Sequence, residues 1–108
     1  MAEVAAGLDS GIEPDREALR TAVRALLDRL AEVAPGRSVE VRVPPYAAVQ
    51  CVEGPRHTRG TPSSVVETDP LTWVALATGR LGWRDAVEAG RVQASGLRSD
   101  LSGYLPLR

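Results

Sequence analysis

One short segment gathers most of the side chains that commonly take part in chemistry. PRHTRGTP, residues 55–62, contains the single histidine of the chain, His57, with Arg56, Arg59 and Gly60. Two guanidinium groups, an imidazole and backbone N–H groups freed around a glycine can bind a carboxylate or a phosphate. Prolines also rigidify ordinary polar connections between strands. The segment is therefore open to two interpretations, an anion-binding loop and a plain connection.

The only enzymatic arrangement that the sequence suggests is a pair formed by Cys51 and His57. A thiol and an imidazole form a nucleophilic pair when they lie within hydrogen-bonding distance. Cys51, however, belongs to an alternation of apolar residues, where a free cysteine usually serves as a small hydrophobic residue. One cysteine and one histidine are also too few for a zinc site of the usual type. We therefore expect no catalytic residue, no metal, no other cofactor and no enzymatic activity.

Length and composition indicate one ordinary globular domain. The chain has 108 residues, of which 44% are hydrophobic, and it contains no Phe. Its 13 basic residues are all Arg, are mixed with 14 acidic residues and give a net charge of −1. Without a basic face, nucleic acid is not expected as a partner. The chain has neither an apolar run of about 20 residues nor a signal peptide, so we expect a cytoplasmic protein with no membrane span.

The elements that position these side chains follow from hydrophobic periodicity. Residues 1–12 are predicted to be a flexible tail, and residues 13–108 a single domain. An apolar stripe predicts a helix from Pro14 to the Pro35-Gly36 pair. Its members are Leu19, Val23, Leu26, Leu27, Leu30 and Val33. Arg20, Arg24, Asp28 and Glu32 fall outside this stripe and are assigned to solvent.

Strands and shorter helices are predicted in the rest of the chain. Alternation or short apolar runs predict strands at 38–43, 46–52, 63–68 and 91–95. Asp69-Pro70 is typical of a helix start, so Asp69 is interpreted as a cap rather than a catalyst. Further helices are expected at 83–89 and as a final turn near 99–105. This order predicts an α+β fold, with an antiparallel or mixed sheet of four to five strands and helices packed on one face.

The C-terminal half resembles a known family. ETDPLTWVALATGRLGWRDAVEAGRVQASG is similar to the signature region of sterol carrier protein 2-like domains. The matching residues are Asp69, the segment 76–81, Ala86, Gly90-Arg91-Val92 and Gly96. Nearly the whole chain further resembles the bacterial sterol carrier protein orthologues, an actinobacterial subgroup, to which VRVPPYAAVQCVEGPRHTRGTP is especially similar.

This resemblance implies a non-enzymatic domain in which a five-stranded sheet and helices enclose an apolar tunnel for sterols, fatty acids or acyl-CoA. We accordingly predict a lipid or acyl ligand in a pocket between the sheet and the helices. The ligand-binding residues predicted for it are Val49, Trp73, Leu76, Leu81, Trp83, Val87, Leu101, Tyr104 and Leu105. The same residues are also compatible with a plain core and a docked terminal helix.

A second class of function stays open. The domain is alternatively a protein-interaction or dimerisation module with a filled core, active as a homodimer or beside a larger enzyme. Mycothiol-dependent maleylpyruvate isomerases carry a carrier-like C-terminal domain behind a metal-binding domain, and this chain resembles the accessory part alone. A cavity favours the carrier, whereas a filled core with an exposed apolar patch favours the interaction module.

Overall fold

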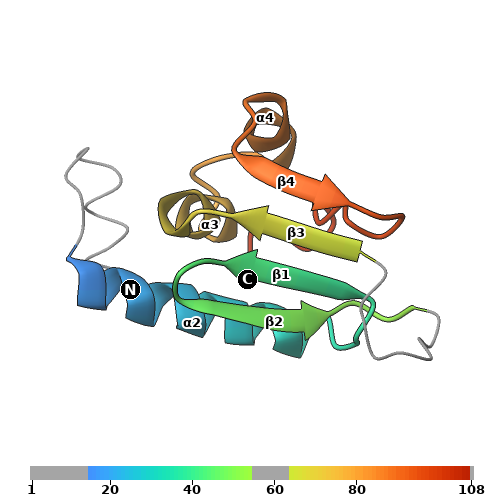
Figure 1. Cartoon of the computed structure of the whole chain (residues 1–108), viewed down its shortest axis with the longest axis horizontal. Coiled ribbons are helices and arrows are strands. Elements are labelled where there is room, and N and C mark those ends of the chain that lie inside the picture. Colours follow the sequence, from blue (N-terminus) through green and yellow to red (C-terminus); the bar gives the residue numbers. More distant parts are fainter. Residues whose placement is uncertain (1–14, 55–63, 108) are drawn as a thin grey trace.

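The computed structural model describes residues 15–54 and 64–107, which form an α+β fold (Figure 1). Its elements are α2 (Arg16–Val33), β1 (Val39–Val43), β2 (Ala47–Cys51), β3 (Ser64–Thr68), α3 (Pro70–Ala77), α4 (Trp83–Glu88) and β4 (Val92–Ser95). The strands form one four-stranded sheet in the order β2-β1-β3-β4. β1 is antiparallel to β2 and parallel to β3, and β4 is antiparallel to β3. The predicted mixed sheet with packed helices is thus confirmed.

The long helix α2 begins and ends where local chemistry dictates. Asp15 caps its N-terminus by accepting a hydrogen bond from the Ala18 N–H at 3.2 Å. The helix stops at Ala34, directly before Pro35, whose ring cannot continue it. Its buried face consists of Leu19, Ala22, Val23, Leu27 and Leu30. None of the helices in the described part of the chain has the length and apolarity needed to cross a bilayer.

The sheet has one apolar face and one polar face. Val39, Val41 and Val43 of β1 are fully buried against the helices. Val41 pairs with Val49 of β2 and with Val66 of β3, so the apolar face continues across the neighbouring strands. The intervening residues carry the polar face, on which the Arg42 guanidinium lies 3.2 Å from Glu40. This alternation is the expected pattern for a sheet that is covered on one side.

Helix α3 starts as predicted and is tied directly to α2. The Asp69 carboxylate accepts hydrogen bonds from the N–H and the hydroxyl of Thr72, at 2.9 and 2.7 Å. The Trp73 side chain, 1% exposed, donates from Nε1 to the Val23 carbonyl at 3.3 Å. The final helical turn predicted near 99–105 is instead a non-helical turn, in which the Tyr104 N–H donates to the Leu101 carbonyl at 2.9 Å.

Backbone segments pack very closely at the end of the sheet where β1 starts and β2 ends. The Ser38 hydroxyl and N–H both donate to the Val52 carbonyl, at 2.7 and 3.0 Å. The Val52 N–H donates to the Ala34 carbonyl at 2.7 Å. Val52 has a φ of 65°, a strained value for a β-branched residue. A Cβ atom at Gly36 would lie 2.2 Å from this Val52 carbonyl group, so only glycine fits there.

Candidate binding cleft

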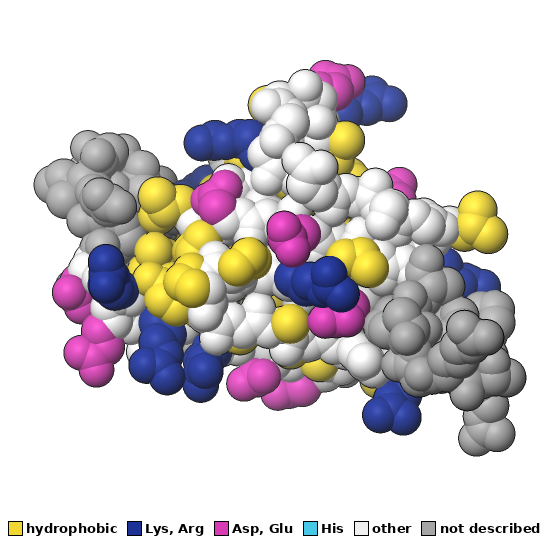
Figure 2. Space-filling model, viewed as in Figure 1, with side chains coloured by type: hydrophobic (Ala, Val, Ile, Leu, Met, Phe, Trp, Pro, Cys, Tyr) yellow, Lys and Arg dark blue, Asp and Glu magenta, His cyan; other side chains and the backbone are white. Residues whose placement is uncertain are grey.

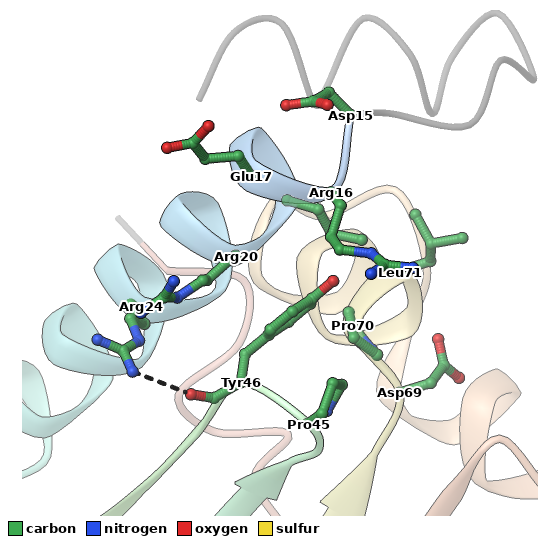
Figure 3. A pocket seen from close by; sticks show the side chains of 11 residues that line it. Asp15, Arg16, Glu17, Arg20, Arg24, Pro45, Tyr46, Asp69, Pro70 and Leu71 are labelled. Atoms are coloured by element: carbon green, nitrogen blue, oxygen red, sulfur yellow. Dashed lines mark hydrogen bonds between the residues drawn. The ribbon is translucent and has the colours of Figure 1, made fainter.

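A broad cleft opens at the other end of the sheet, where α2 and α3 begin and the β1–β2 turn passes between them (Figure 3). Its volume is about 1310 Å³, more than the roughly 300–1,000 Å³ of many small-molecule sites. It is lined by Asp15, Arg16, Glu17, Leu19, Arg20, Arg24, Pro45, Tyr46, Asp69, Pro70 and Leu71. The cleft is therefore built from three elements that are distant in sequence.

Apolar groups form the inner surface of the cleft. The half-buried Tyr46 side chain extends from the β1–β2 turn into the space between α2 and α3 (Figure 3). Pro45 lies beside it on the same turn, and Pro70 and Leu71 form the first turn of α3. In Figure 2, hydrophobic side chains gather on the left of the molecule, next to dark blue side chains along α2. The cleft thus combines an apolar surface with adjacent positive charge.

Three arginines of α2 line one wall of the cleft. Arg16, Arg20 and Arg24 follow one another at intervals of four residues, so they share a helix face. Arg24 donates from one guanidinium nitrogen to the Tyr46 carbonyl at 3.3 Å, which connects α2 to the β1–β2 turn. The Arg16 side chain reaches across the cleft towards Leu71 (Figure 3). The wall therefore presents positive charge along about two turns of helix.

The lining also contains three acidic residues, Asp15, Glu17 and Asp69. Asp15 and Asp69 accept hydrogen bonds from the N-terminal N–H groups of α2 and α3. Glu17 points away from Tyr46 and the apolar surface (Figure 3). Within residues 15–54 and 64–107, no ion pair joins an acid to Arg16, Arg20 or Arg24. Guanidinium groups that form no ion pair with a protein carboxylate are suited to binding the carboxylate or phosphate oxygens of a ligand.

A family comparison shows where the chain belongs. A family model described as "Bacterial SCP ortholog" matches residues 15–107, which includes every described residue. The chain belongs to the bacterial sterol carrier protein orthologues. The predicted family is thereby confirmed. A search of curated proteins found no match to the chain.

In this sterol carrier protein orthologue, most of the nine residues predicted to bind a ligand lie in the core or pack against it, and none lies in the large cleft. Trp73, Leu76 and Leu101 are at most 1% exposed within the core. Val49, Leu81, Trp83 and Leu105 are partly buried and pack against it. Val87 and Tyr104 are 40% and 38% exposed. Val49 lines a smaller cleft of about 350 Å³ beside Arg24 and Tyr46, and none of the nine lines the large cleft. Their role in binding stays a prediction.

The predicted anion-binding loop cannot be compared with the cleft. Arg56, His57, Arg59 and Gly60 all lie outside the described residues. Cys51 is described and fully buried. Burial raises the pKa of its thiol to about 11, which opposes formation of the nucleophilic thiolate. In the part of the chain that is described, no three His, Cys, Asp or Glu side chains come together as a metal site.

The residues of the cleft were not predicted as a site from the sequence. The sequence predicts that Arg20 and Arg24 lie on the solvent-exposed side of a helix. They do, but this exposed side also forms a wall of the cleft. One usable signal was the repetition of Arg at four-residue intervals in the first half of α2. The contributions of Tyr46 and Leu71 depend on the packing of three separate elements, which no local pattern contains.

Proposed function

We propose that this sterol carrier protein orthologue is a carrier domain that binds an amphipathic anion, such as a fatty acid or another acidic lipid, in the cleft between α2 and α3. The single observation that carries the proposal is an apolar surface, formed around Tyr46 and Leu71, beside the Arg16 guanidinium and next to the helix face that carries Arg20. Among the described residues, neither arginine forms an ion pair. Membership in a carrier family supports the same function.

Each part of the cleft has a physical role in this function. The hydrocarbon chain would lie against Tyr46, Pro70 and Leu71, and burial of each CH₂ group contributes roughly 0.8 kcal/mol. The acidic head would lie against the arginines of α2, where charge-assisted hydrogen bonds fix its orientation. Because the cleft is open, ligand uptake and release need no large rearrangement of the sheet.

We propose binding without chemistry as the activity of the domain. The cleft wall offers guanidinium, phenol and aliphatic groups, and its Asp15 and Asp69 carboxylates hold helix termini. The thiol of Cys51 is buried in the core with a raised pKa. These features support a carrier rather than the nucleophilic pair considered for Cys51 and His57.

The test compares two substitutions that introduce the same charge at different apolar positions. Leu71→Asp places a carboxylate on the apolar surface of the cleft, at an early position of α3 where an acid suits the helix dipole. Val87→Asp is the matched control on the exposed surface of α4, and it also tests a residue of the predicted pocket. Binding of dodecanoate is measured by displacement of a fluorescent fatty acid.

We expect Leu71→Asp to weaken dodecanoate binding at least about tenfold, because a carboxylate replaces apolar contact and repels the acidic head. Val87→Asp should leave the affinity within about twofold. Loss of binding in Val87→Asp alone would instead place the ligand beside the later helices. Absence of dodecanoate binding to the unsubstituted protein would overturn the proposal.

A second candidate is the interaction module, and one observation favours it. β4 ends the sheet order, and among the described residues no strand pairs with its outer edge. Gln93, Ala94 and Ser95 on this strand are exposed and uncharged, and Leu97 beside them is fully exposed. Uncharged edge strands favour pairing with another strand. Sedimentation of the protein and of Ala94→Lys tests this candidate, which requires a dimer that the substitution dissociates.

A further inference from the structure

The electrostatics of α2 indicate which head group the cleft is built to hold. A helix N-terminus carries partial positive charge, so acids stabilise the first turn and cations the last turn. α2 has Arg16 and Arg20 in its first two turns, and its last turn contains no basic residue. Arg16 is thus placed in the first turn, where a cation weakens the helix, although Asp15 and Glu17 at the same terminus stabilise it. Such an arrangement is expected where another property, such as ligand binding, determines the position of the charges.

The spacing of the arginines adds to this cost. Like charges four residues apart on a helix repel one another, and Arg16, Arg20 and Arg24 form two such pairs. Successive arginines are separated by about 6 Å along the helix axis, since each residue rises 1.5 Å. No acid of the described chain forms an ion pair with any of the three. An anion in the cleft would relieve both the mutual repulsion and the repulsion from the helix terminus.

The number of donors decides between two kinds of head group. A carboxylate has one negative charge and two oxygens, and one guanidinium can satisfy it in a bidentate pair. A phosphate monoester carries about −1.5 to −2 charges and three terminal oxygens. It can therefore accept hydrogen bonds from two guanidinium groups. Figure 3 shows the Arg16 guanidinium near Leu71 and the Arg20 guanidinium turned towards Arg24, and both residues are exposed, so their side chains would turn towards one shared phosphate. Arg24 is already held by its hydrogen bond to the Tyr46 carbonyl and contributes charge from a fixed position.

We infer that the cleft selects an amphipathic ligand whose head group is a phosphate ester rather than a carboxylate. This inference rests on the proposed function, because it assigns the head group of a ligand whose hydrocarbon chain lies against Tyr46 and Leu71. Arg16 and Arg20 bind the phosphate oxygens, and Arg24 adds positive charge. The chemical class is a single-chain alkyl or isoprenoid phosphate.

Calorimetric titration with dodecyl phosphate and dodecanoate tests the inference, because the two ligands share one chain and differ in the head group. At about pH 7.5 we expect dodecyl phosphate to bind about tenfold more tightly, from its additional charge-assisted hydrogen bonds. Lowering the pH to about 5.5 should reduce this preference, because the phosphate gains its second proton near pH 6.

Substitutions on α2 test which arginines cause the preference for a phosphate over a carboxylate. The double variant Arg16→Gln, Arg20→Gln keeps good helix-forming residues and removes both charges. It should bind the two ligands with affinities within about threefold of each other. Arg29→Gln is the matched control on α2, because Arg29 does not line the cleft. This control should keep the full preference for the phosphate.

The outcomes separate the inference from the proposed function. Equal binding of both ligands by the unsubstituted protein would overturn the phosphate preference and leave the carrier function standing. Binding of neither ligand would overturn both. If inorganic phosphate binds as tightly as dodecyl phosphate, the hydrocarbon chain of the ligand contributes nothing to the affinity. That result would overturn the assignment to an amphipathic ligand. A preference that persists in the double variant would remove Arg16 and Arg20 from the head-group site.

Discussion

The two ends of the sheet differ in how tightly they are packed. At the end where β1 begins, Ser38, Val52 and Ala34 are joined by short hydrogen bonds, and Gly36 leaves no room for a single methyl group. At the other end, the starts of α2 and α3 stand apart around Tyr46 and leave a cleft of about 1310 Å³.

This difference places the closely packed backbone and the proposed binding cleft at opposite ends of one small domain. The closely packed end ties the C-terminus of α2 to the sheet through the hydrogen bond from the Val52 N–H to the Ala34 carbonyl. The open end can then expose Arg16 and Arg20 and leave apolar surface accessible. Closely packed backbone and an accessible cleft would be difficult to combine at one place, since interiors pack nearly without voids.

The largest effect on stability is expected from adding a methyl group at Gly36, at the closely packed end of the sheet. Gly36→Ala should lower the free energy of unfolding by about 3 kcal/mol, because its Cβ atom would collide with the Val52 backbone and its φ of +147° disfavours alanine. Gly90→Ala is the control: its φ is +73°, and nothing lies within 4 Å of the added atom. That change should cost about 1 kcal/mol. Equal losses in urea denaturation would contradict the close packing described for Gly36.

Alkaline pH should also destabilise the closely packed end, because it favours ionisation of the buried Cys51 thiol. Burial raises the pKa of the folded thiol from its ordinary value of 9.0 to about 11. Between these values the unfolded chain loses its proton first, so stability falls as pH rises. The loss should reach about 2 kcal/mol near pH 11. Denaturation of Cys51→Ala across this range should show a shallower decline. Parallel curves would mean that Cys51 does not contribute.

Loss of the cleft tyrosine should have a smaller effect on stability than filling the packed end. Tyr46→Ala should lower the free energy of unfolding by about 1–2 kcal/mol, because the ring is half-buried and packs against the edge of the core. The same change should weaken dodecanoate binding by removing apolar surface from the cleft. Tyr46→Phe is the control and should preserve both properties. A loss of stability as large as that of Gly36→Ala would mean that both ends are packed alike.

The smallest effect on stability has the opposite sign. The double variant Arg16→Gln, Arg20→Gln should raise the free energy of unfolding by about 0.3–1 kcal/mol, because it removes cations from a helix N-terminus. The change should shrink at high salt, which screens exposed charges. Arg29→Gln, nearer the C-terminus of α2, should not stabilise the protein. A loss of stability in the double variant would show that these arginines support the fold.

The sequence predicted the elements well because their signals are local. The apolar stripe of Leu19, Val23, Leu27 and Leu30 and the cap at Asp69 each lie within a few residues, and both appear as expected. The final turn at Leu101–Tyr104 was predicted as helical, although a single turn offers too few hydrogen bonds to ensure a helix. The sequence predicted an antiparallel or mixed sheet but no strand order, because pairing between strands that are distant in sequence leaves no local signal.

The cleft was not predictable in the same way. Leu71 looked like one more apolar position of a short helix, and Tyr46 like the start of a strand. Their place beside α2 results from the crossing of helices and a turn, which is a property of the assembled fold. Trp73 and Leu76 were predicted to bind a ligand because they are apolar, and they are buried in the core for the same reason. Hydrophobicity alone does not distinguish a core residue from one that lines a ligand pocket.

The arrangement of α2 has a consequence for how this fold can evolve. Its core face, with Val23 and Leu27, is separate from the exposed face that carries Arg16, Arg20 and Arg24. Substitutions on the exposed face alter the charge of the cleft and leave the interior packing intact. If the cleft binds ligands as proposed, a change of a few surface codons would alter its preference between acidic, phosphorylated and neutral head groups.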